Sequence, residues 1–137
     1  MRLAMLTPAP DYGVPHDWAF DIQADALREA GAEVTAVSWA NAADLSGFDL
    51  ILPLVTWGYH LKYDQWLTFL ERLEAENLPV ANPPSILRWN SDKAYLAELG
   101  RKGVPVVPTL EVDHLNEAAL AAAAGVLGSD ELVVKPP

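Results

Sequence analysis

The chain has 137 residues, of which 51% are hydrophobic and 20% are charged, a composition typical of soluble globular proteins and not of disordered or membrane proteins. Its net charge of −10 repels nucleic acid and anionic membranes, so we expect neither as a partner. The sequence contains no cysteine, which excludes disulfides and thiolate chemistry.

The opening residues, MRLAMLTPAP, form too short an apolar run for a signal peptide, and Pro8 interrupts them. No later run is long enough to span a bilayer. These two features predict a cytoplasmic protein.

Strand-like apolar runs alternate with helical patterns along the first part of the chain. The expected elements are a strand at residues 2–8, a helix from about Asp17 to Ala30, a strand at 33–39, a strand at 50–55, an amphipathic helix at 61–77 and a short strand at 79–82. Asp17 is available as a helix cap and Gly31 as a stop. Such alternation is typical of βαβ units, so residues 1–83 are predicted to form a doubly wound, Rossmann-like α/β domain with four parallel strands.

The second part, residues 84–137, contains fewer elements. We expect a helix near Asp92–Lys102, a strand at 110–113, a helix near Glu117–Leu127 and a last strand at 131–137. Two helices and two strands are too few to close a core, and the chain ends just after an apolar strand. The interpretation is an incomplete α+β subdomain of a truncated protein.

Ligands bind to parallel sheets outside the carboxyl ends of the strands. The segments that follow the first and third strands, TPAPDYGVPH and TWGYHLKYD, are long and rich in aromatic and charged residues. Their alternative role is to fold back on the surface without binding anything. The candidate substrate-side residues in the segments that follow the strands are Asp11, Tyr12, Trp57, Tyr59, His60 and Asn82.

Common nucleotide and metal motifs are absent from the sequence. It contains neither G-x-G-x-x-G after the first strand nor a P-loop. His16, His60 and His114 lie far apart without the spacing of metal ligands, so no metal site is predicted.

Two lysines are candidates for binding an anion. Lys93 is expected in the first turn of a helix, where it opposes the helix dipole at a cost of about 0.3–1 kcal/mol unless a bound polyphosphate reverses the effect. Lys135 follows three apolar residues in a predicted strand, where a buried ammonium needs an anionic partner. The alternatives are that Lys93 faces water beside Asp92 and that the strand end at Lys135 reaches solvent.

The sequence NPPSILRWNSDKAYLAELGRKGVPVVPT, followed later by LVVKPP, resembles the start of the ATP-grasp domain in ligases similar to glutathione synthetase. The matching features are Asn82, Lys93, the segment 103–109, and Lys135 with Pro136. The resemblance implies that residues 1–83 form a pre-ATP-grasp domain and that Lys93 and Lys135 bind ATP phosphates.

The resemblance also implies a function. The parent enzyme is expected to join a small carboxylate or amino-acid-like substrate to an amine or thiol through an acyl phosphate, with ATP and Mg²⁺ as cofactors. The catalytic residues and magnesium ligands would lie beyond Pro137, so the 137-residue chain alone is expected to be inactive. A homodimer is compatible with the sequence. The alternative function is a non-catalytic, receiver-like signalling module, although Thr7-Pro8 and Val55-Thr56 stand where a receiver carries acidic residues.

Overall fold

The computed structural model describes residues 1–135, and its contacts divide the chain into a first unit, Met1–Arg88, and a second unit that begins at Trp89. We describe each unit by itself. The elements that begin in the first unit are β1 (Arg2–Thr7), α1 (Asp17–Glu29), β2 (Glu33–Ser38), β3 (Leu50–Leu52), the 3-10 helix η1 (Tyr59–Lys62), α2 (Tyr63–Ala75) and α3 (Pro84–Ser91).

The first unit contains a parallel sheet with the strand order β2-β1-β3, which confirms the predicted α/β class. Leu3 of β1 pairs with Val34 of β2 on one side and with Leu50 of β3 on the other. β1 is therefore the central strand.

The predicted fourth strand at residues 79–82 is reduced to a single parallel bridge between Ile51 and Val80. The Ile51 amide donates to the Pro79 carbonyl at 2.7 Å, and the Ala81 amide donates to the Ile51 carbonyl at 2.9 Å. Proline has no amide hydrogen, and Asn82 adopts a left-handed conformation with φ of 66°, so the extended segment ends at once. Pro53 ends β3 early for the same reason.

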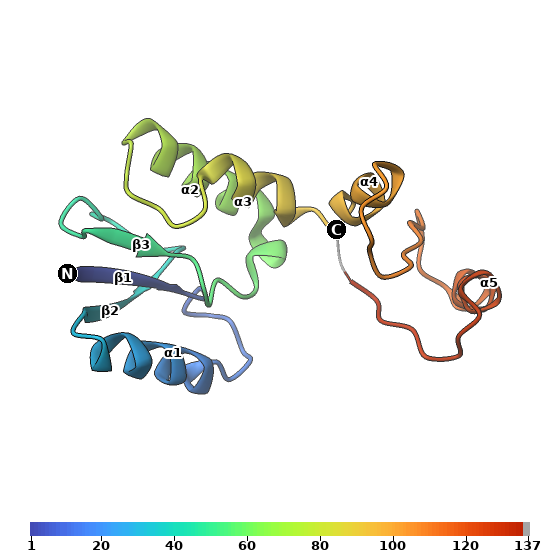
Figure 1. The fold of residues 1–137 in the computed structure, drawn as a ribbon, viewed down its shortest axis with the longest axis horizontal. Coiled ribbons are helices and arrows are strands. Elements are labelled where there is room, and N and C mark those ends of the chain that lie inside the picture. Colours follow the sequence, from blue (N-terminus) through green and yellow to red (C-terminus); the bar gives the residue numbers. More distant parts are fainter. Residues whose placement is uncertain (136–137) are drawn as a thin grey trace. The chain divides into compact units, whose positions relative to one another are not determined.

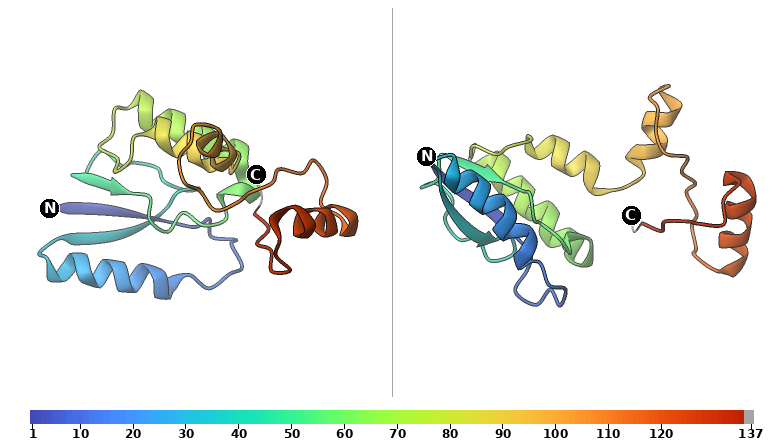
Figure 2. Two further views of the ribbon diagram at one scale, coloured as in Figure 1. Left: turned by 45° about the vertical axis from the view of Figure 1, so that its right-hand side comes forward. Right: turned by 60° about the horizontal axis from the view of Figure 1, so that its bottom comes forward.

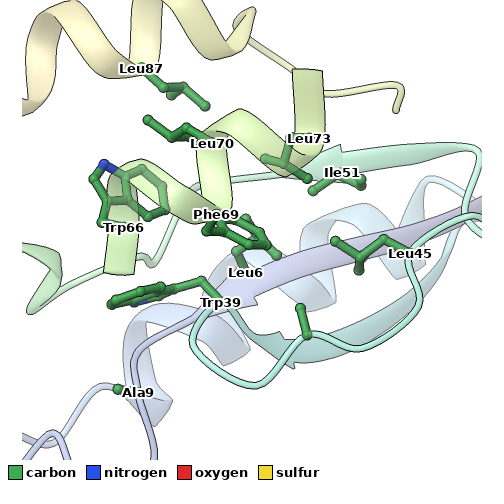
Figure 3. Close-up of a cluster of buried hydrophobic side chains, with 12 residues drawn as sticks. Leu6, Ala9, Trp39, Leu45, Ile51, Trp66, Phe69, Leu70, Leu73 and Leu87 are labelled. Carbon is green, nitrogen blue, oxygen red and sulfur yellow. The ribbon is translucent and has the colours of Figure 1, made fainter. Parts of the chain in front are cut away.

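Helices cover both faces of this sheet, with α1 on one side and α2 on the other (Figures 1 and 2). Side chains alternate along β1, so that Leu3 and Met5 pack on the α1 side while Ala4 and Leu6 pack on the α2 side. The α2 side is the larger core, and Figure 3 shows its aromatic and leucine side chains, contributed mainly by α2. Hydrophobic burial on both faces stabilises the unit.

The connection between β2 and β3 contains no helix, although a parallel crossover usually does. Residues 39–49 form a loop instead, and its side chains Trp39 and Leu45 are fully buried against the α2 side. The Trp39 amide donates to the Thr7 carbonyl at 3.1 Å, which continues the pairing of β1 and β2 by one bond. The buried side chain of Trp39 thus helps to cover the face of the sheet that a crossover helix would otherwise cover.

Two further helices lie in the second unit, α4 (Tyr95–Arg101) and α5 (Glu117–Leu127). The predicted bounds of α5 are confirmed, and Asn116 caps it by accepting from the Ala119 amide at 2.9 Å. In contrast, the cap predicted for α1 is wrong, because His16 is the N-cap residue and Asp17 is the first helical residue.

The strands predicted at 110–113 and 131–135 are wrong, because no strand occurs between residues 89 and 135. A strand requires a neighbouring strand for its backbone hydrogen bonds, and this part of the chain supplies none. Val133 is 85% exposed instead of buried. Pro136 and Pro137, the end of the predicted last strand, lie outside the described residues.

Candidate functional site

Two loops meet at the carboxyl edge of the parallel sheet. Residues 8–16 follow β1, and residues 53–58 follow β3 and lead into η1. β1 and β3 are neighbouring parallel strands, so their carboxyl ends bring these two segments together. We call this pair of segments, with η1, the edge loops.

An ion pair joins the edge loops. Lys62 Nζ donates to both carboxylate oxygens of Asp11, at 2.8 Å and 2.7 Å. This hydrogen bond, with the nearby positive charge, holds the pKa of the Asp11 carboxyl below its usual value. Asp11 is therefore an ionised carboxylate at neutral pH, and it is suited to orienting a lysine or accepting a hydrogen bond but not to acting as a general acid.

A second contact joins Tyr12 to Gly58. Gly58 is buried and adopts a left-handed conformation with φ of 77°. A Cβ atom at this position would lie only 2.4 Å from Tyr12 Cδ2, so the ring of Tyr12 packs directly against the glycine backbone. Only glycine meets both requirements, the positive φ and the close approach.

Aromatic side chains surround these two contacts. Trp57 lies 5.8 Å from Trp18 at the start of α1, measured between ring centroids. Tyr59 stacks on Trp66 of α2 at 5.4 Å and lies 6.0 Å from His60. The structure therefore ties Trp57 and Tyr59 to both helices that flank the sheet. Aromatic side chains grouped in this way are typical of small-molecule sites, where apolar walls accompany a few polar groups.

Asn82 follows the bridge at Val80 but is not joined to the other candidates. Within residues 1–135 its side chain makes no hydrogen bond or ion pair, and it is exposed. Its left-handed backbone, which asparagine tolerates better than most residues, gives it a structural role in the turn before α3.

Lys93 does not lie in the first turn of a helix, so that prediction is wrong. Helix α3 ends at Ser91 and α4 begins at Tyr95, which places Lys93 in the turn between them. Its Nζ donates to the Asn90 carbonyl at 2.8 Å and lies 5.9 Å from the centre of the Tyr95 ring. A cation at a helix carboxyl end is favoured by the dipole, so the expected electrostatic conflict does not arise.

The other ATP-directed candidate, Lys135, is exposed. Among residues 1–135 there is no group of three or more histidines, cysteines, aspartates or glutamates arranged to hold a metal ion. The described residues therefore include both candidate lysines but no such cluster of metal-ligating side chains.

Three residues that contact the candidate site residues were missed in the sequence. Lys62 lies 51 residues from its partner Asp11, and no local pattern links them. Gly58 stands between two aromatic residues in the segment TWGYH, a position where glycine indicates close backbone packing. Trp18 was assigned to the predicted helix, and its contact with Trp57 depends on the fold.

A doubly covered parallel sheet whose carboxyl edge carries joined, aromatic-rich loops defines an α/β domain of the doubly wound class, a class in which ligands usually bind at that edge. Residues 3–82 match the family described as the N-terminal domain of the D-cycloserine synthetase DcsG. The chain belongs to this family.

Two relatives extend the likeness beyond residue 82. The cycloserine biosynthesis protein DcsG of Streptomyces lavendulae is 32% identical over 139 aligned positions, which cover 98% of this chain and 45% of that protein. The crystal structure of D-cycloserine synthetase DcsG superposes with a TM-score of 0.70 at 28% identity, covering 92% of this chain and 42% of the other. The chain thus spans less than half the length of these biosynthetic relatives. Within residues 1–135, no helix has the length and apolar character needed to cross a membrane.

Proposed function

We propose that this chain is the N-terminal part of an ATP- and Mg²⁺-dependent ligase of the ATP-grasp kind. The enzyme activates a carboxylate as an acyl phosphate, which an amine or thiol then attacks to release phosphate. The observation that carries this proposal is the pair of joined edge loops, because they lie at the ligand-binding edge of a domain whose family is named for a synthetase. Since the relatives are named for cycloserine, the product is cycloserine or a similar small compound.

The edge loops form one wall of the substrate pocket in this proposal. Lys62 presents an ammonium that is held by Asp11, and Trp57 and Tyr59 supply flat apolar surfaces. A small amino-acid-like carboxylate suits this combination, because the cation pairs with the carboxylate while the rings exclude water. His60 is exposed beside Tyr59 and is available for a polar contact.

Lys93 and Lys135 contact the ATP phosphates in the same proposal. Lys93 is half-buried and held near the Asn90 carbonyl, and polyphosphate binding would redirect its ammonium from that carbonyl. Magnesium would offset charge on the transferring phosphoryl group. Its ligands would come from a part of the enzyme outside residues 1–135. In this proposal, the second unit is one portion of the ATP-grasp subdomain.

The test measures ATP-dependent turnover in the full-length protein that carries this chain. Lys93→Met and Lys135→Met should each keep the protein folded and lower kcat/KM for ATP at least about tenfold, or about 1.4 kcal/mol, the scale of a lost charge-assisted phosphate contact. Lys102→Met is the matched control, because Lys102 is an exposed lysine of the same unit paired with Glu98. Turnover that is unchanged in both variants would contradict the assigned lysines, and a protein that hydrolyses no ATP with any small carboxylate would favour the receiver-like alternative.

A further inference from the structure

His16 is the last residue of the loop that follows β1 and the N-cap residue of α1. The centroid of its ring lies 6.3 Å from that of Tyr12, the residue that packs against Gly58. Two residues further along the chain, Trp18 contacts Trp57 of the other edge loop. His16 is therefore a polar member of the aromatic group at the carboxyl edge of the sheet.

A hydrogen bond to the backbone determines which nitrogen of the His16 ring carries the hydrogen. Nδ1 lies 3.2 Å from the Val14 carbonyl oxygen, which can only accept, so the neutral ring carries its hydrogen at Nδ1. Nε2 then has a free lone pair and makes no hydrogen bond within residues 1–135. The side chain is 25% exposed, and Nε2 is open to solvent. The neutral ring thus presents an acceptor to a molecule at this edge.

A carboxylate lies beside this lone pair. Asp17 Oδ1 is 4.0 Å from His16 Nε2, which is too far for a direct hydrogen bond, and the Asp17 side chain is 92% exposed. Two accessible acceptors at this spacing can share one ammonium group, because its three hydrogens point in different directions. The Asp17 charge also offsets the unfavourable effect of a helix N-terminus on a cation.

Other ligand classes fit these two side chains less well. A carboxylate or phosphate needs hydrogen-bond donors, whereas the neutral His16 ring offers an acceptor at Nε2 and Asp17 repels anions. A metal ion needs further ligands, and residues 1–135 contain no group of three or more metal-ligating side chains. The remaining candidate is a small organic cation with N–H donors.

We propose that His16 and Asp17 bind the ammonium group of an amino-acid substrate. The inference rests on the proposed function, because it assigns a further contact to the same substrate wall. A free amine distinguishes an amino acid from other small carboxylates, so these two residues would determine substrate specificity. No bond forms or breaks at His16 in this role.

The test compares D-serine with D-glycerate, which share one carbon skeleton but carry an ammonium and a hydroxyl group, respectively, at the second carbon. Calorimetry on the full-length protein without ATP measures both affinities. D-serine should bind at least about tenfold more tightly, or about 1.4 kcal/mol, because a charge-assisted hydrogen bond is stronger than a neutral one. Absence of this preference, whether both compounds bind equally or neither binds, overturns the proposal.

His16→Asn separates recognition of the amine from a structural role. The new amide can still donate to the Val14 carbonyl, but it has no acceptor at the position of Nε2. This variant should weaken D-serine binding at least about fivefold and leave D-glycerate binding unchanged. His114→Asn is the matched control and should change neither affinity, because His114 is exposed in the second unit. Equal weakening of both compounds in His16→Asn would show that His16 only shapes the loop, which contradicts the proposal.

Failure of this inference and failure of the proposed function are distinguishable, because the binding measurement requires no ATP. A protein that shows ATP-dependent turnover but no preference for D-serine contradicts only the roles of His16 and Asp17. A protein that prefers D-serine, loses this preference in His16→Asn and shows no turnover contradicts only the ligase activity.

Discussion

The ring of Tyr12 packs against the backbone of Gly58 so closely that a single methyl group on the glycine would lie 2.4 Å from Tyr12 Cδ2. These residues are 46 positions apart in the sequence, and their contact fixes the loop after β1 against the loop after β3. The arrangement of the edge loops therefore depends on residue 58 having no side chain.

Alanine in a left-handed backbone conformation costs about 1–2 kcal/mol of unfolding free energy. Gly58→Ala should cost more than this, because its methyl group would also meet the Tyr12 ring. Gly31→Ala is the matched control, because Gly31 has a φ of 88° and open space around the added methyl group. Urea unfolding of both variants measures the difference. Equal losses of stability would show that the Tyr12 ring moves aside without cost, which contradicts a rigid edge-loop contact.

The ion pair between Asp11 and Lys62 should make the free energy of unfolding depend on pH in the acidic range. Because the hydrogen bond from Lys62 lowers the pKa of folded Asp11, the pair stabilises the fold above the unfolded pKa of about 3.9, and this contribution is lost as pH falls through the lower folded pKa. Carbon-detected NMR titration should show the pKa of Asp11 rising in Lys62→Met. The pKa of Asp44, which is lowered mainly by Ser46, should stay unchanged in that variant. An Asp11 pKa that is insensitive to Lys62 would contradict the pair.

Leu70 should contribute strongly to the core on the α2 side of the sheet. Leu70 is fully buried there, so Leu70→Ala is expected to cost about 2–5 kcal/mol of unfolding free energy through lost burial and a cavity. Leu61→Ala serves as the control because Leu61 is 68% exposed, and a change within about 0.5 kcal/mol is expected. A small effect of Leu70→Ala in thermal or urea unfolding would show that the core rearranges around the deletion.

The 137-residue chain by itself should bind ATP weakly. Residues 1–135 contain Lys93 and Lys135 but no cluster of magnesium ligands. We therefore expect a binding free energy for ATP no more favourable than about −4 kcal/mol, equivalent to a Kd near 1 mM. Isothermal titration calorimetry in the presence of Mg²⁺ measures this affinity. Micromolar binding would mean that the chain contains a nucleotide site that the proposed roles of Lys93 and Lys135 do not describe.

The α/β class and the three parallel strands were predictable because each strand and helix has its own apolar period. Leu3 and Met5 alternate with Ala4 and Leu6 on opposite faces, as a strand covered on both sides requires. The bounds of α5 were predictable because Asn116 caps the start of the helix and Gly128 caps its end. These features depend on residues that are close together in the sequence.

The errors occurred where structure depends on distant partners or on proline. Residues 110–113 have the composition of a strand but no neighbour with which to pair, and Pro79 and Pro83 flank the short bridge at Val80. No helix was predicted at residues 84–91, although Pro84 begins α3 and proline favours the first position of a helix. At the candidate site, Asp11 and Tyr12 were identified correctly as loop residues, but their partners Lys62 and Gly58 could be found only in the fold.

The central position of β1 has a consequence for hydrogen exchange. Residues Leu3 to Leu6 are at most 1% exposed, and β1 is paired with a strand on each side. Their amide protons should therefore exchange with deuterium only when the entire first unit opens, whereas amides at the ends of helices exchange through local fraying. A mass spectrometric measurement on the first seven residues alone would report the global stability of this unit, and it would register any ligand that binds the folded state at the distant edge of the sheet.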